Sequence, residues 1–196
     1  MQAVVSLLPE PYNIRVQLIW DELEERFNLK YIRSTPFPHF TWQLGEGYQQ
    51  EEVMEWLHDQ TLRLQPFDLY TVGLNRFGNS SPVLFIEISK TAELLQLHSI
   101  IWNKLLALTT DPSPLYSVES WQPHITLAME DLSWDRVGAV AGFLQEKDLS
   151  WRFSLDNFVI ACQQADGMSQ IEHIFRFGKG LTDSFDCGLP RATDQN

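Results

Sequence analysis

The chain has few cysteines, no long hydrophobic run and a shortage of positive charge, and each shortage excludes a class of protein. Cys162 and Cys187, its two cysteines, form no metal-spaced motif and are too few for a disulfide framework, so we expect reduced thiols in the cytosol. No stretch approaches the roughly 20 apolar residues that a membrane span needs, and the apolar run 3–8 is too short for a signal peptide. We therefore expect a cytoplasmic protein with no membrane partner.

The shortage of positive charge bears on partners. Lys and Arg number 14 against 26 Asp and Glu, which gives a net charge of −12. A protein that grips long RNA or DNA by its phosphates is usually basic. The acidic balance therefore makes binding of long nucleic acid an unfavoured function, whereas a small nucleotide or an RNA terminus in a locally positive cleft remains compatible with it.

Aromatic and aliphatic residues are abundant, and they set the fold class. With 196 residues, 44% of them hydrophobic, the chain can bury a core without disulfides or metals, as one large domain or two intimate lobes. Hydrophobic periodicity predicts helices over 12–27, 49–63, 91–109 and 133–147, the last capped by Ser133. It predicts strands over 3–8, 38–44, 67–74, 83–89, 123–129, 152–161 and 170–177.

The order of these elements is repeated. Each half runs helix, strand, helix, strand, strand, and the short connections late in each half imply antiparallel pairing. An α+β, sandwich-like fold with two related lobes fits this order best. We expect residues 1–178 to form one bilobal domain, which we take to be a monomer. Residues 179–196 turn polar, so they are predicted to be a flexible tail.

Two short segments share one pattern. Residues 38–42 read Pro-His-Phe-Thr-Trp and residues 123–127 read Pro-His-Ile-Thr-Leu. Because side chains alternate along a strand, His39 and Thr41 share one face, His124 and Thr126 share another, and the hydrophobes point to the core. Two such strands side by side would present two imidazoles and two hydroxyls to one cleft.

These residue types suit phosphodiester chemistry. Histidine, with a reference pKa of roughly 6.5, can both take and give a proton near neutral pH. One histidine can activate the attacking oxygen while the other protonates the leaving oxygen, and a threonine hydroxyl can donate to a non-bridging phosphate oxygen. The scheme needs no metal and no cofactor. A zinc site built on His39 and His124 lacks the tight ligand spacing that would support it.

One His-x-Thr motif is a weak signal of a catalytic site, but two copies at matching places are a stronger one. The alternative is a structural role, in which these are polar residues of edge strands whose hydrogen bonds are satisfied by backbone. The pattern resembles the 2H phosphoesterase superfamily, named for paired His-x-Thr motifs, which includes 2′-5′ RNA ligase and cyclic phosphodiesterase families. Residues 5–9 and 73–78 also look like this group. The resemblance implies a bilobal α+β fold with a pseudo-twofold axis and a metal-independent site in a central groove. Ala-Met-Glu at 128–130, where the ligase branch often has a basic residue, favours a smaller phosphodiester.

The predicted function is therefore a metal-independent phosphoesterase of the 2′,3′-cyclic phosphodiesterase or 2′-5′ RNA ligase type. Its substrate would be a cyclic phosphate or a 2′-5′ phosphodiester of a nucleotide or RNA end. His39 and His124 would be catalytic, and Thr41 and Thr126 would bind phosphate. The alternative is a nucleotide-binding or scaffold module with little turnover. The sequence leaves open the exact substrate, which histidine is the acid, and whether hydrolysis or ligation is favoured.

Several other residues have two interpretations. Tyr116 and Trp121, just before the second motif, could stack a base, and core packing or loop anchoring explains them equally well. We expect His58 to be solvated, and His98 (half-buried) and His173 to be structural. Four arginines are candidates for a phosphate clamp, and the sequence does not rank them: Arg33, Arg76, Arg152 and Arg176.

Overall fold

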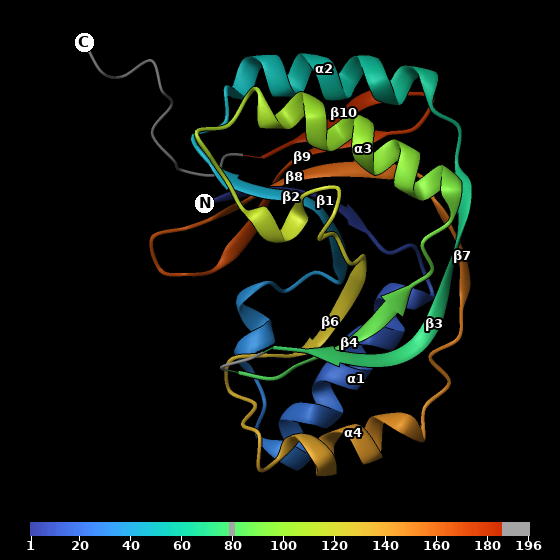
Figure 1. Ribbon diagram of the computed structural model, residues 1–196, viewed down its shortest axis with the longest axis vertical. Coiled ribbons are helices and arrows are strands. Elements are labelled where there is room, and N and C mark those ends of the chain that lie inside the picture. Colours follow the sequence, from blue (N-terminus) through green and yellow to red (C-terminus); the bar gives the residue numbers. More distant parts are fainter. Residues whose placement is uncertain (79–80, 186–196) are drawn as a thin grey trace.

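The computed structural model describes residues 1–78 and 81–185, which form two antiparallel sheets with flanking helices (Figure 1). The larger sheet has the strand order β10 (Gly180–Ser184), β9 (Ser169–Arg176), β8 (Asn157–Gln163), β1 (Gln2–Leu7), β2 (His39–Glu46), β5 (Asp111–Pro112). The smaller sheet has the order β6 (His124–Ala128), β4 (Val83–Ile88), β3 (Phe67–Phe77), β7 (Arg152–Leu155). The expected α+β class with two lobes is confirmed.

Each sheet is covered by two helices on its outer side (Figure 1). α2 (Gln50–Arg63) packs on β8, β9 and β10, and α3 (Ala92–Leu106) packs on β2. α1 (Tyr12–Phe27) packs on β6, and α4 (Val137–Gln145) packs on β3. The lobes are therefore not the two halves of the sequence, since each sheet contains strands from both halves.

Local signals explain two helix ends and correct a third. α3 begins after Thr91, whose hydroxyl accepts from the Leu94 N–H at 3.2 Å, as an N-cap should. α1 ends at Phe27, and the C-cap that follows, Asn28, adopts the left-handed conformation, which asparagine tolerates. The predicted start of α4 at Ser133 is wrong. The Ser133 carbonyl accepts from the N–H of Arg136 and Val137 in a preceding turn, and the helix begins at Val137.

The segment predicted as a single strand, 152–161, is two strands in different sheets. Asn157, which is 2% exposed, lies where the chain passes from β7 to β8. Its side chain accepts from the Leu7 N–H at 2.9 Å and donates to the Leu7 carbonyl at 3.1 Å, while the Ser6 hydroxyl donates to its backbone carbonyl. This residue therefore ties the crossing point to the end of β1, beside His39 in the register of the sheet.

The structure corrects three expectations, which concern residues 180–184, His58 and Cys162. Residues 180–184 are no tail, because β10 pairs with β9 and the His58 ring accepts from the Leu181 N–H at 3.0 Å. His58 is thus a half-buried structural contact of β10 and not the fully solvated side chain that we expected. Residues 186–196 lie outside the described part. Cys162 is disulfide-bonded, so the reduced thiol expected there is wrong, and Cys187 lies outside the described residues.

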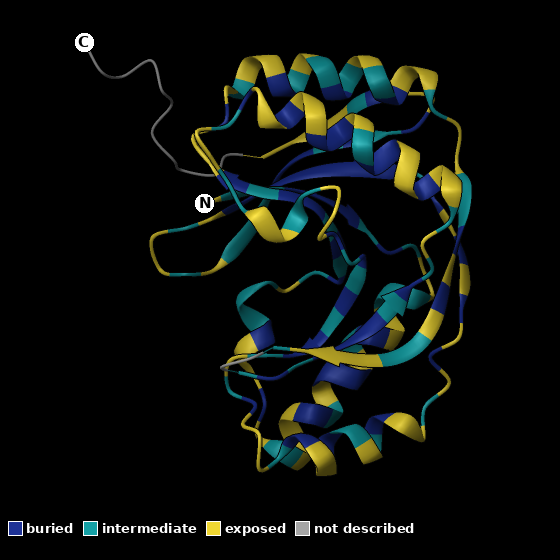
Figure 2. Cartoon of the chain, viewed as in Figure 1, coloured by how far each residue is buried: buried dark blue, intermediate teal, exposed yellow. Residues whose placement is uncertain are grey.

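The main apolar core runs through both lobes, and a small second cluster lies around Val5, Val159 and Ala161. The buried faces of both sheets belong to one hydrophobic cluster that contains Trp42 of β2 and Leu127 of β6. Figure 2 shows the buried residues lining the inner sides of the helices and the sheets. Among the described helices, none is both long and apolar enough to cross a bilayer. The cytoplasmic location stays a prediction.

Asn157→Ala should lower the free energy of unfolding by about 2–4 kcal/mol, because the N–H and the carbonyl of Leu7 each lose a buried partner worth roughly 1–3 kcal/mol. Urea titration followed by tryptophan fluorescence measures this. Asn103→Ala is the control, since its side chain is exposed and makes one 3.4 Å bond to Ser99, and it should stay within about 0.5 kcal/mol. Equal effects of the two variants would contradict the role given to Asn157.

Candidate active site

The two His-x-Thr segments open β2 and β6, which contact each other where the sheets meet. The predicted alternation is confirmed over 39–42 and 124–127, whereas Gln43, the next residue of β2, is buried. In β2, Phe40 and Trp42 are buried at 1% and 0% exposure, and in β6 Ile125 and Leu127 are both at 0%. The two histidines and two threonines, His39, Thr41, His124 and Thr126, are half-buried on the opposite faces.

The two imidazoles are held in the same way. His39 Nδ1 lies 2.9 Å from the Phe37 carbonyl, and His124 Nδ1 lies 2.6 Å from the Gln122 carbonyl. A carbonyl only accepts, so in each ring Nδ1 carries the hydrogen and donates it. In the neutral ring, Nε2 is then left with a lone pair. Each motif therefore offers one Nε2 acceptor whose tautomer is set by the backbone two residues before it.

The proline of each motif explains why that carbonyl is in place. A residue before proline is held in an extended conformation, and proline itself has no N–H to donate. The Pro38 carbonyl accepts from the Leu8 N–H at 3.2 Å, and the Pro123 carbonyl accepts from the Ile88 N–H at 3.0 Å. The proline is thus fixed to the neighbouring strand, and the carbonyl before it is left to the imidazole.

Burial makes both histidines weak bases. Desolvation lowers the pKa of His39 from 6.5 to about 4, with the Phe37 carbonyl opposing the shift and the charge of His124 adding to it. Burial also lowers the pKa of His124, against the Gln122 carbonyl. Both rings are therefore neutral at pH 7, and they lie near enough for the charge of one to act on the other.

A β-bulge follows the threonine of each motif. Thr41 pairs with Val5, while the next register pair is Gln43 with Val4. Likewise Thr126 pairs with Phe85, and the next pair is Ala128 with Leu84. At each bulge an indole N–H donates to the threonine carbonyl, from Trp121 to Thr41 at 2.9 Å and from Trp20 to Thr126 at 3.1 Å.

Phenylalanine rings flank both histidines. Phe37 lies 5.5 Å from the His39 ring, measured between centroids, and Phe77 lies edge-on to His124 at 4.9 Å. Phe77 is 40% exposed, so it presents a free apolar surface beside His124. The sequence analysis did not single it out, because an aromatic at a strand end has no distinguishing pattern.

Trp121 cannot stack a base, so that prediction is wrong. It is 1% exposed, its ring stacks on His98 with centroids 3.8 Å apart, and Trp42 lies 5.4 Å away. The alternative interpretation, core packing, is correct for it. Tyr116 is half-buried, and burial raises the pKa of its hydroxyl, which hydrogen-bonds with the Thr41 side chain. Base stacking by Tyr116 stays a prediction.

The remaining histidines lie away from this pair. His98, expected to be half-buried, is 1% exposed in the core, where burial lowers its pKa to about 4. His173 is 8% exposed on β9 and lies 3.0 Å from the Ser184 hydroxyl, in keeping with a structural role.

Three of the four candidate clamp arginines are paired with carboxylates: Arg33 with Asp21 and Glu24, Arg152 with Asp68, and Arg176 with Asp156. Arg76 lies over the Trp134 ring, 5.9 Å from its centroid. Its register partner is Leu84, a core residue, whereas the partner of Phe77 is Val83. The side chain of Arg76 therefore leaves the strand on the opposite sheet face from that of Phe77. None of these four arginine contacts brings a guanidinium to the motif histidines.

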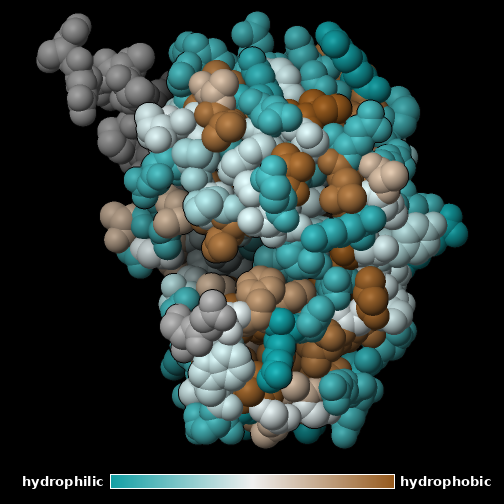
Figure 3. All heavy atoms as spheres, in the orientation of Figure 1, coloured by the Kyte–Doolittle hydropathy of each residue, from teal (hydrophilic) through white to brown (hydrophobic). Residues whose placement is uncertain are grey.

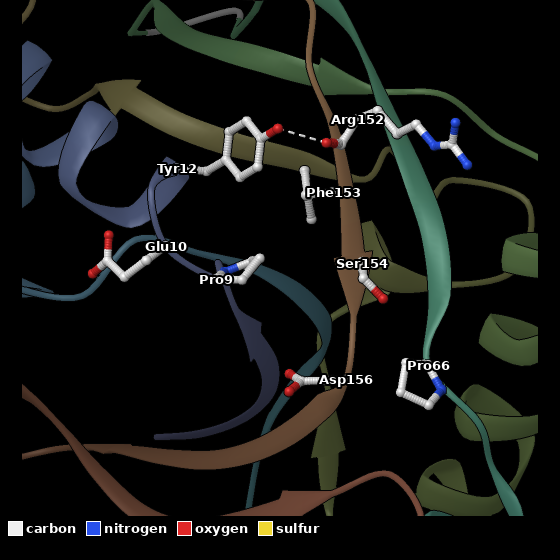
Figure 4. A pocket seen from close by; sticks show the side chains of 8 residues that line it. All are labelled: Pro9, Glu10, Tyr12, Pro66, Arg152, Phe153, Ser154 and Asp156. Atoms are coloured by element: carbon white, nitrogen blue, oxygen red, sulfur yellow. Dashed lines mark hydrogen bonds between the residues drawn. The ribbon is translucent and has the colours of Figure 1, made fainter.

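A separate hollow of about 450 Å³ lies where the β1–α1 connection meets β7 (Figure 4). Its lining includes Glu10, Tyr12, Arg152 and Asp156 but neither motif histidine. The space-filling view shows hydrophobic and hydrophilic side chains interspersed over one face (Figure 3). Within residues 1–78 and 81–185, no three His, Cys, Asp or Glu side chains are grouped to hold a metal.

Each of the two antiparallel sheets contributes one His-x-Thr strand to the place where the sheets meet. This arrangement is the one expected for a protein with paired His-x-Thr motifs, and comparison with known families agrees with it. The model of the 2′-5′ RNA ligase superfamily matches residues 10–167, so the chain belongs to this superfamily. Among its relatives, "Putative phosphoesterase" of Bacillus cereus strain B4264 is 26% identical over 161 residues, which cover 81% of this chain and 88% of the relative. The protein of the same name in Bacillus licheniformis is 25% identical over 167 residues, covering 84% and 93%.

Both motif histidines should be neutral Nδ1–H tautomers at pH 7. Carbonyl acceptors hold that hydrogen, and burial keeps the pKa of each ring below 6.5. Nitrogen-15 chemical shifts of His39 and His124, recorded from pH 8 to pH 3.5, measure tautomer and titration together. An Nε2–H tautomer or a charged ring at pH 7 would contradict the arrangement.

Proposed function

We propose that the protein is a metal-independent phosphoesterase that opens a 2′,3′-cyclic phosphate, or cuts a 2′-5′ linkage, in a nucleotide or RNA end. The observation that carries this proposal is the pair of Nε2 lone pairs, each fixed by the same backbone bond and close enough to influence each other. The family and the names of the relatives support a phosphoesterase. The acidic charge favours a small substrate over a long polynucleotide.

In the ring-opening reaction one neutral imidazole takes a proton from water at Nε2 as the water oxygen attacks phosphorus. The bond from phosphorus to one ribose oxygen breaks, and the other imidazole, protonated at Nε2, gives its proton to that oxygen. The product is a phosphate monoester. Thr41 and Thr126 donate hydrogen bonds to the non-bridging oxygens, where negative charge builds up.

The substrate itself supplies the reason for one ring to become protonated. In the free enzyme burial lowers the pKa of both histidines. A phosphodiester anion between them favours the charged form of an adjacent imidazole and raises its pKa. The acid–base pair is thus completed by binding, and the titration belongs to the pair of rings together.

Phe77 is the residue that we propose for contact with the nucleobase, in place of the buried Trp121. Its ring is 40% exposed and lies edge-on to His124, and aromatic rings stack on any base through its π-face.

The second candidate function is a nucleotide-binding module with little turnover. The lowered pKa of both histidines favours it, because neither ring is an acid at pH 7 until an anion binds. Turnover of a 2′,3′-cyclic nucleotide, measured beside binding of the nucleoside 2′-monophosphate, separates the two functions.

His39→Ala and His124→Ala should each lower kcat by about 10²–10⁴-fold with little change in KM, because each removes one proton transfer. The double variant should be scarcely worse than either single one, since the two rings act as a unit. Excess chelator should leave wild-type turnover unchanged. His58→Gln, on α2 beside β10, is the matched control and should retain activity. Near-wild-type turnover by either single variant would refute the two-histidine mechanism.

The pH dependence of kcat/KM should be bell-shaped, with its alkaline limb below pH 6.5. This parameter reports the free enzyme, in which one ring must be protonated while the pKa of His39 is about 4 and that of His124 is also lowered. Raising the pH removes the needed proton, and lowering it toward pH 4 protonates the base. The kcat profile should lie at higher pH, because the bound anion raises the pKa of the acid. An alkaline limb of kcat/KM above pH 7 would be the opposite result.

A further inference from the structure

The carbonyls of both motif threonines have the same kind of partner, although nothing in the motif itself supplies it. Trp20 reaches Thr126 from α1, and Trp121 reaches Thr41 from the segment before β6. The two tryptophans are 2% and 1% exposed. A buried indole N–H needs an acceptor, and each of these has taken the carbonyl at the one place in its strand where a bulge follows.

The bulge gives that bond a specific effect. Where two residues oppose one, the ladder is locally disrupted and the strand bends, so the direction of the preceding side chain depends on the contacts that hold the bulge. In both strands that preceding side chain is the threonine whose hydroxyl faces the histidine's side of the sheet. An error of about 1 Å in such a group can cost on the order of 10²-fold in rate.

Trp121 has a second connection. The residue after it, Gln122, offers the carbonyl that holds His124 Nδ1 at 2.6 Å. Two consecutive residues therefore bind the threonine of one motif and the histidine of the other. Trp20 makes no such link, since its bond joins β6 to the helix behind it.

We propose that Trp20 and Trp121 are positioning residues, which act through the carbonyls of Thr126 and Thr41 to aim the two threonine hydroxyls at phosphate. Trp121 also fixes the first motif relative to the second. The proposal rests on the proposed function, because it deepens the account of the same site.

The test replaces the N–H and keeps an aromatic ring. Trp20→Phe and Trp121→Phe should each lower kcat on a 2′,3′-cyclic nucleotide by about 10- to 100-fold, with KM and the pH limbs of kcat/KM nearly unchanged because the histidines keep their bonds. Trp151→Phe is the matched control. Trp151 is 5% exposed and its indole donates to the Asp148 carbonyl at 2.9 Å, outside the two motifs, so its kcat should stay within about twofold.

A double-mutant cycle separates positioning from a loss of packing. If Trp20 acts through Thr126, Trp20→Phe should lower kcat little further in a Thr126→Ala enzyme. If Trp20 acts through general packing, the fold-losses in kcat of the two single variants should multiply in the double variant. The same cycle pairs Trp121→Phe with Thr41→Ala. Multiplicative losses in both cycles, or losses no larger than that of Trp151→Phe, would overturn the proposal.

A further measurement needs no variant and no turnover. Binding of a nucleoside 2′-monophosphate to the wild type should slow hydrogen exchange of the Trp20 and Trp121 indoles more than that of Trp151. Equal slowing of all three would overturn the positioning role even if the variants fail to fold. A wild type that binds this ligand but turns over no phosphodiester would refute the proposed function and leave this exchange result to decide the positioning role.

Discussion

The hydrogen bond from each imidazole Nδ1 to the carbonyl before its proline is the interaction on which the site depends. It selects the tautomer, and with the tautomer it leaves the Nε2 lone pair of each ring as the acceptor. Proline makes the bond available, because its own carbonyl is taken by the neighbouring strand and it offers no competing N–H. A site built from backbone bonds in this way needs no further side chain to orient either histidine.

The burial that stabilises the fold also sets the chemistry. Because the rings are desolvated, each is a weak base, and the pKa of His39 falls to about 4. Such a pair is uncharged at pH 7. In the proposed function, this pair of neutral imidazoles would gain its charge from the anionic ligand that it binds.

The sequence predicted the faces of the motif residues better than it predicted the connections around them. Alternation in 38–44 and 123–129 reports which face each residue occupies, and this held for both histidines and both threonines. Alternation does not report which strand lies alongside. The sequence therefore carried no signal for the division of 152–161 between two sheets or for the pairing of β10. Trp20 lies 106 positions from Thr126, and a tryptophan in an amphipathic helix is read as core. The stacking prediction for Trp121 was wrong because an aromatic residue near a motif fits a stacking platform and a core equally well.

Each sheet contains strands from both halves of the sequence, which explains how one chain holds two distant motifs at a fixed separation. β1 and β2 come from the start of the chain, yet β8 and β9 complete their sheet, while β3 and β4 pair with β6 and β7. Neither sheet can form without the other half of the sequence, and their core is continuous. Separation of the lobes would therefore open the shared core. The two histidines are held by the same cooperative structure, so their spacing is a property of the folded state, and in the proposed function a phosphate would meet a pair that is already arranged.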